Sequence, residues 1–177
     1  MHDMTTIDAY GTLIEPATVR IQRLLPGSIE RVWEYLTVSD LRRRWLASGE
    51  MTLAAGAPFT LTWRNDEISD PAGERPDGIG GEHSMASRIV EVDPPRRLVF
   101  TWDGGAEVTV ELAPQGRDTL LVVTHRRLPD RAQLCGVSAG WHAHLDVLDA
   151  VLRGARPGPF WDDWGRLRAE YETRIPE

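Results

Sequence analysis

The first 50 residues change from one hydrophobic period to another. Between residues 17 and 25, apolar side chains such as Val19 and Ile21 recur at every second position, which predicts a β-strand. After Pro26-Gly27 the apolar residues follow a helical spacing, and Ser28 is suited to cap the first turn. A second short helix is predicted to begin at Ser39 and to end by residue 49.

The middle of the chain has the period of two that is typical of strands. Strands are predicted near residues 59–63, 83–92, 97–102, 107–112 and 119–126. Short glycine-containing connections between the later strands are typical of hairpins, so the sheet should be antiparallel. Residues 65–81 are acidic and rich in glycine and proline, which predicts a mobile loop with little to bury, interpreted as a lid or rim beside the mouth of a cavity.

The last third of the chain returns to a helical period. An apolar stripe predicts a long helix over residues 129–153, followed by Gly154 at the position of a C-terminal cap. A final helix is predicted over residues 160–173. We therefore expect an α+β domain at residues 17–177, with six or seven antiparallel strands around the long helix, preceded by a flexible segment at residues 1–16. This polar, glycine-containing segment is interpreted as a loose tail or an edge segment.

Composition and charge restrict the partners. The 177 residues suit one domain, and a net charge of −7 argues against nucleic acid and anionic membranes as partners. One cysteine, Cys135, excludes an intrachain disulfide. The first sixteen residues lack the pattern of a secretory signal, and no apolar run is long enough to span a bilayer. The expected location is the cytoplasm.

Several segments together resemble a known family. They are the Leu25-Pro26 turn with its following helix, residues 41–46, the two strands of residues 88–102 joined at Pro94-Pro95, and Gly140-Trp141 in the long helix. In this order they resemble the START and birch-pollen-allergen-like (SRPBCC) superfamily. Within it, they resemble the family named for the activator of the heat-shock-protein ATPase. The resemblance covers about residues 17–154.

The resemblance implies a helix-grip fold, in which a curved antiparallel sheet encloses a hydrophobic cavity against the long helix. It implies no shared catalytic residues, no metal and no cofactor. The co-chaperones that gave the family its name carry a further domain before this one, and only about sixteen residues precede the matching region here. A chaperone partner and a second copy of the chain are left open as partners.

The predicted ligand-binding residues lie on the elements that would line this cavity. Aromatic side chains offer flat apolar surface, and His83 is the candidate for a polar group that orients a ligand. The full predicted set is Phe59, Trp63, His83, Met85, Phe100, Trp102, Trp141, Leu145 and Leu148. The alternative for each aromatic residue is ordinary core packing.

Other polar residues favour structural or solvated positions. His142 and His144 are two residues apart, so on a helix they point in different directions and cannot chelate one metal ion; one is expected to be solvated and one partly buried. The three arginines of residues 42–44 are interpreted as the solvated side of a short helix. Glu107 and Glu111 share one strand face, which is predicted to be exposed.

Three functions fit these observations. The first is a carrier or sensor of a small apolar or amphipathic molecule, and the number of aromatic residues on cavity-facing elements favours it. The second is a cavity enzyme of the cyclase or hydratase kind, which would need an ionisable group in the pocket with a shifted pKa. The third is a chaperone-related or stress-related interaction module, which would need an exposed apolar patch.

Overall fold

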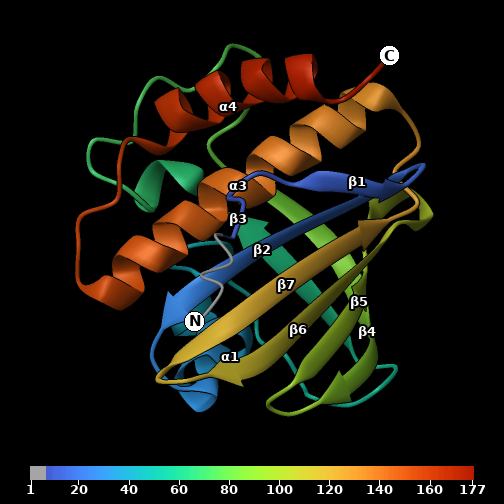
Figure 1. Cartoon of the computed structure of the whole chain (residues 1–177), viewed down its shortest axis with the longest axis vertical. Coiled ribbons are helices and arrows are strands. Elements are labelled where there is room, and N and C mark those ends of the chain that lie inside the picture. The colour runs from blue at the N-terminus through green and yellow to red at the C-terminus, as the bar shows by residue number, and fades with distance from the viewer. Residues whose placement is uncertain (1–6) are drawn as a thin grey trace, which may run out of the picture.

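A computed structural model describes residues 7–177 and contains one seven-stranded antiparallel sheet in the order β1-β2-β7-β6-β5-β4-β3 (Figure 1). The strands are β1 Thr12–Glu15, β2 Thr18–Pro26, β3 Pro58–Trp63, β4 His83–Asp93, β5 Arg97–Thr101, β6 Glu107–Gln115 and β7 Asp118–Arg126. The helices are α1 Ile29–Thr37, α2 Ser39–Arg42, α3 Arg131–Arg153 and α4 Phe160–Arg174, with single 3-10 turns η1 Asn65–Glu67 and η2 Asp103–Gly105. The predicted α+β helix-grip architecture is confirmed.

The sheet has one buried face, as the alternating pattern requires. Strand register places one row of inward side chains side by side across four strands, each at most 1% exposed: Ile21, Val123, Val110 and Leu98. Because side chains alternate along a strand, this register sends the intervening polar residues to the other face. Glu107 and Glu111 lie on that other face, where they pair with Arg127 and Arg97.

The long helix α3 crosses the buried face of the sheet, and α4 lies along α3 (Figure 1). Asp130 caps α3 by accepting a hydrogen bond from the backbone N–H of Gln133, and Gly154 ends the helix with φ 70°. A left-handed backbone is readily adopted only by glycine, so this residue fixes where the helix stops. Ser28 caps α1 in the same manner as Asp130, through Arg31 N–H.

The N-terminal segment is more ordered than the sequence indicates. Residues 1–6 lie outside the described part of the chain, but Thr12–Glu15 forms the edge strand β1 against β2. The backbone N–H of Gly11 donates to the Tyr171 hydroxyl, 2.7 Å away on α4. Of the two interpretations of residues 1–16, a loose tail or an edge segment, residues 12–15 fit the edge segment. The partners of this segment lie in distant parts of the chain, which local composition does not reveal.

Arg42 also departs from the prediction. It is 2% exposed, and its guanidinium donates to the carbonyl oxygens of Leu36, Ala47 and Gly49. Burial lowers its pKa to about 10. These carbonyl oxygens lie in the last turn of α1 and in the loop after α2, which ends at Arg42. The inward side chain of Arg42 supplies hydrogen bonds that a continuing helix would otherwise supply.

The segment at residues 65–81 is docked for part of its length. Asp66 accepts from the Trp161 indole N–H at 2.7 Å, Ser69 accepts from the Phe160 backbone N–H at 2.9 Å, and Ile68 is buried. The expectation that the segment has little to bury is wrong for this first half, because α4 supplies its partners. Residues 78–81, which follow, are exposed.

Within residues 7–177, none of the helices combines the length and the hydrophobicity that a bilayer crossing requires.

Candidate functional site

A cavity of about 300 Å³ lies between the end of the sheet, α3 and the first turns of α4. Its wall is aromatic and aliphatic, with few polar groups. The lining residues are Leu46, Trp63, Asn65, Ile79, His83, Met85, Trp102, Asp103, Gly136, Val137, Gly140, Trp141, His144, Phe160, Trp161 and Trp164. Five of the seven tryptophans of the chain are among them.

The sheet side of the cavity is a chain of aromatic rings. Trp63 stacks on His83 at a centroid distance of 5.7 Å and meets Trp102 edge to face at 5.5 Å. Trp102 then lies 6.1 Å from Trp141 of α3. Strand pairing sets the beginning of this chain, because Trp63 of β3 is directly opposite His83 of β4.

The helix side of the cavity comes from the start of α4. Phe160 and Trp161 meet edge to face at 5.0 Å, and Trp161 meets Trp164 at 5.9 Å. The hydrogen bond from Trp161 to Asp66 ties this helix end to the docked segment. The position of the wall therefore depends on contacts between α4 and residues 65–75.

Two glycines of α3 explain why space remains beside the helix. Gly136 and Gly140 are four residues apart, so they lie on one face of α3, and both line the cavity. A Cβ atom added to Gly140 would meet nothing within 4 Å. Both glycines are partly buried, and a Cβ atom on Gly136 would meet the Arg168 guanidinium at 3.8 Å. Glycine inside a helix costs about 1 kcal/mol relative to alanine, so the open space at Gly140 is kept at a cost to helix stability.

His144 is the most enclosed polar side chain of the cavity wall. Its Nδ1 lies 2.6 Å from the Gly140 carbonyl oxygen, which can only accept, so Nδ1 carries a proton. Its Nε2 lies 2.9 Å from Oδ1 of Asn65, and the amide can complete this pair by a half-turn that presents its NH₂ group. Burial lowers the pKa of His144 to about 4, so the ring is neutral at pH 7. Both nitrogens are already bound to protein groups.

His125 supports the cavity wall from behind. It is fully buried on β7, and its Nδ1 accepts from the Trp141 indole N–H at 3.0 Å. An indole N–H can only donate, so the proton of the neutral ring is on Nε2, which has no partner among residues 7–177. Burial lowers the pKa of His125 to about 3. The ring therefore orients Trp141 without adding charge.

The structure brings five of the predicted site residues together and leaves four elsewhere. Trp63, His83, Met85, Trp102 and Trp141 line the cavity. Phe59 and Phe100 instead border a separate void of about 10 Å³, which is too small for an organic ligand. Leu145 and Leu148 are fully buried in the core and border neither space. These four were expected at the cavity because their faces were assigned correctly but their depth along the sheet and helix was not.

Several lining residues were not predicted from the sequence. Trp161 and Trp164 belong to the predicted last helix, and Asn65 and Ile79 belong to the segment predicted as a lid or rim beside the cavity mouth. None of the four is in the predicted ligand-binding set. The glycine pair at residues 136 and 140 was the one local signal that could have indicated the cavity, because glycine is unfavourable in a helix interior.

The expectation for the two neighbouring histidines is wrong in one respect. Both are buried, His142 at 5% and His144 at 6% exposure, because α4 and the N-terminal segment cover the side of α3 that was expected to face solvent. They do point in different directions. His144 faces the cavity, whereas His142 binds the Tyr171 hydroxyl through Nδ1 at 2.8 Å.

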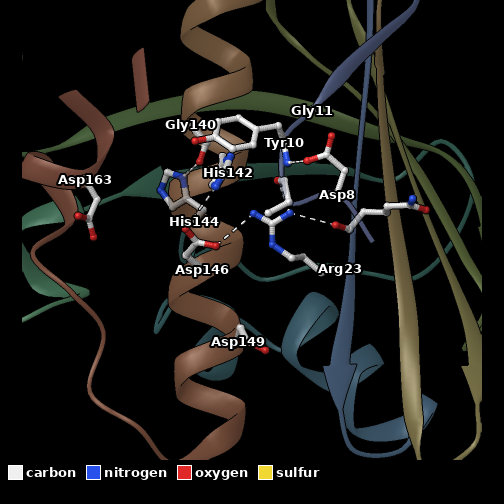
Figure 2. Close-up of polar contacts among 12 residues, drawn as sticks. Asp8, Tyr10, Gly11, Arg23, Gly140, His142, His144, Asp146, Asp149 and Asp163 are labelled. Atoms are coloured by element: carbon white, nitrogen blue, oxygen red, sulfur yellow. Dashed lines mark hydrogen bonds and ion pairs between the residues drawn. The ribbon is translucent and has the colours of Figure 1, made fainter. Parts of the chain in front are cut away.

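His142 belongs to a polar network on the other side of α3 (Figure 2). Its Nε2 lies 3.6 Å from Asp146, whose other carboxylate oxygen accepts from Arg23 at 3.1 Å. Burial, with Arg23 as a further cause, lowers the pKa of His142 to about 4, and burial raises the pKa of Tyr171 to about 12. This network binds Gly11 of the N-terminal segment to α3 and α4.

Among the described residues, no three His, Cys, Asp or Glu side chains are grouped so that they could hold a metal ion.

Comparison with known proteins identifies the family. The model of the family described as "Activator of Hsp90 ATPase homolog 1-like protein" matches residues 26–153. The chain belongs to this family, within the SRPBCC superfamily. The resemblance inferred from the sequence is confirmed. A search of curated protein sequences finds no match.

Solved structures share the fold of this chain. The solution structure of the protein encoded by gene BPP1335 from Bordetella parapertussis is 36% identical, with 100% of this chain and 97% of that chain covered and a TM-score of 0.80. The crystal structure of CalU16 from Micromonospora echinospora is 22% identical, covers 88% and 86% of the two chains, and has a TM-score of 0.65. DynU16, a protein of the dynemicin biosynthetic locus, is 20% identical, covers 80% of this chain and 49% of its own, and has a TM-score of 0.63. The last two show the fold alone.

Proposed function

We propose that this protein binds a small, flat, largely apolar molecule in the cavity between the sheet, α3 and α4. The observation that carries the proposal is a cavity of about 300 Å³ lined by five tryptophans. This volume is at the lower end of the usual range for small-molecule sites, and an aromatic lining with few polar groups is typical of them. Indole faces favour flat ring systems, which bury the most apolar area against them.

Binding alone accounts for the groups present in the wall. Both nitrogens of His144 have protein partners, so its shifted pKa reflects burial and does not indicate a free acid or base. The exposed large apolar residues of the described chain include Ile14, Val38 and Val90, which lie on separate elements. Neither observation favours the enzyme or the interaction module over a binding protein.

The test is to fill the cavity without disturbing its frame. In Gly140→Leu, the new side chain enters space that is empty within 4 Å of its Cβ and occupies the ligand volume. Gly165→Leu is the matched control, because Gly165 is an exposed α4 residue that does not line the cavity and also has open space at its Cβ. Both changes replace a helical glycine, so both should raise helix propensity equally.

The probe is N-phenyl-1-naphthylamine, a neutral dye whose emission rises in apolar surroundings. The natural chain and Gly165→Leu should enhance its emission and bind it with similar Kd. Gly140→Leu should weaken binding by about tenfold or more, because a leucine removes the apolar contact area that the dye would bury. Equal binding by all three proteins would place the dye outside the cavity and overturn the proposal, as would the absence of binding by the natural chain.

A further inference from the structure

The cavity lining holds one negatively charged side chain, Asp103, and two histidines, His83 and His144. Asp103 is the only charged residue in the lining described above, and no lysine or arginine belongs to it. Asp103 begins the turn η2 directly after Trp102, and it is exposed. Among residues 7–177 its carboxylate forms no ion pair and no side-chain hydrogen bond. Among the described residues, the lining therefore includes one carboxylate without a partner, on the residue that follows Trp102 in the chain.

The buried histidines at the cavity do not offset this charge. Burial lowers the pKa of His144 to about 4 and that of His125, behind the wall, to about 3. Both rings are therefore neutral at pH 7, and each has a tautomer fixed by a protein partner. His144 and His125 therefore contribute no positive charge at pH 7.

The arginines near the cavity each lie close to a carboxylate. Arg127, which donates to the Gly105 carbonyl oxygen of η2, lies 3.4 Å from Glu107. Arg64, next to Asn65 of the wall, pairs with Glu82 at 2.8 Å, and Arg75 pairs with Asp66 at 2.5 Å. Arg168 approaches Gly136 from α4 and lies 3.6 Å from Glu172. The Arg168 pair is the loosest of these, since its buried Nε has no hydrogen-bond partner among the described residues. None of these arginines belongs to the lining, which leaves Asp103 as its one charged side chain in a chain of net charge −7.

Aromatic faces add to the same preference. The face of an indole ring carries negative electrostatic potential, and indole is the side chain to which cations bind best. Five indoles and the Phe160 ring surround this space. Trp102 is only partly buried and lies between Trp63 and Trp141, and Asp103 is the next residue in the chain.

We propose that the cavity selects organic cations: molecules with a flat apolar body and one ammonium group, bound with the body among the tryptophans and the ammonium beside Asp103. This inference rests on the proposed function, since it names the class of ligand for the same cavity. It predicts that the cation binds more tightly than a neutral molecule of equal shape. A purely apolar cavity would favour the neutral molecule, because burying an unpaired charge costs free energy.

Three naphthalenes of nearly equal size test the inference. They are 1-naphthylmethylamine, which is a cation at pH 7, neutral 1-naphthalenemethanol, and the anion 1-naphthoate. Isothermal titration calorimetry on the whole chain at pH 7 and low salt measures each Kd. The cation should bind about fivefold to tenfold more tightly than the neutral compound, because it gains cation–π contacts and attraction to one partly screened carboxylate. The anion should bind more weakly than both.

Two aspartate variants separate Asp103 from the general acidity of the chain. Asp103→Asn should weaken binding of the amine about fivefold and leave the Kd of the alcohol unchanged, since only the cation loses an ion-pair partner. Asp93→Asn removes the same charge from an exposed position at the end of β4, away from the cavity lining, and should change neither Kd. Added salt should weaken binding of the amine by the natural chain more than by Asp103→Asn.

The outcomes distinguish the two proposals. Tight binding of the alcohol with no preference for the amine would overturn the charge selection and leave the proposed function standing. Preference for naphthoate, or an unchanged preference for the amine in Asp103→Asn, would also overturn it. Failure of all three compounds to bind would count against the cavity as a binding site and against the inference together.

Discussion

The two sides of α3 bury the same kind of residue in different ways. His144 faces the cavity and His142 faces the Tyr171 network, and burial lowers the pKa of both to about 4. On the His142 side, Tyr171 is fully buried, and an ion pair and several hydrogen bonds complete the packing. On the His144 side, two glycines leave about 300 Å³ unfilled. One face of α3 thus has a buried polar centre around Tyr171, called the filled side below, with a groove of about 260 Å³ at its outer edge beside Arg23 and Asp146. The other face, called the open side, is aromatic and lines the cavity.

The two halves of α4 have different roles. Its C-terminal half carries Tyr171, which holds the N-terminal segment through Gly11, and its N-terminal half carries the aromatic wall of the cavity. Filled, hydrogen-bonded regions contribute stability, whereas unfilled space lowers it, so the cavity depends on the filled side to hold α4 in place.

The largest expected effect comes from removing the centre of the filled side. Tyr171→Ala should lower the free energy of unfolding by about 3–5 kcal/mol, the usual cost of deleting a buried aromatic ring. It also leaves the Gly11 N–H and Nδ1 of His142 without their partner. Urea unfolding followed by circular dichroism measures the change.

Trp164→Ala is the matched change on the open side. Trp164 is only partly buried against the cavity, so its loss should cost about 1.5 kcal/mol or less. Equal costs for the two variants would show that the two faces of α3 are packed alike, and the comparison would fail.

Stability should fall as pH decreases from 6.5 toward 4. The pKa values of His142 and His144 are lowered to about 4 and that of His125 to about 3, so in this window the unfolded chain binds protons that the folded chain does not. Each histidine contributes a slope of up to about 1.4 kcal/mol per pH unit. Asp146 acts in the opposite direction, because burial raises its pKa in the folded state.

Unfolding midpoints in urea at pH 7, 5.5 and 4.5 measure this slope, and proton NMR of the histidine rings assigns it to residues. His144→Gln should reduce the slope of stability against pH by the contribution of one histidine, up to about 1.4 kcal/mol per pH unit. Ring signals of His142 and His144 that titrate near pH 6.5 would contradict the burial on both sides of α3.

A smaller loss of stability is expected from breaking the contact between α4 and residues 65–75. Asp66→Ala removes the acceptor of the Trp161 indole N–H and the partner of Arg75, both at partly exposed positions. The cost should be about 1 kcal/mol, because exposed pairs contribute little and one hydrogen bond contributes modestly. Hydrogen exchange of the Trp161 indole proton should accelerate. Unchanged exchange would mean that residues 65–75 do not hold the cavity wall.

Local patterns in the sequence were sufficient for the framework. Alternation predicted the strands, Ser28 and Gly154 marked helix ends, and the family motifs indicated the order of elements. These signals act between residues a few positions apart, which is why they are visible in the sequence. They also indicated Trp63, His83, Met85, Trp102 and Trp141 as residues of the site, and these five do line the cavity.

What only the tertiary structure decided depends on contacts between distant residues. The Asn65–His144 pair spans 79 positions and the Gly11–Tyr171 hydrogen bond spans 160, so no local pattern encodes either one. The same holds for the inward turn of Arg42, for the depth of Phe59, Phe100, Leu145 and Leu148 in the core, and for the arrival of Trp161 and Trp164 at the cavity. Periodicity determines which face of an element is apolar. The segments that pack against that face decide where along it a cavity remains.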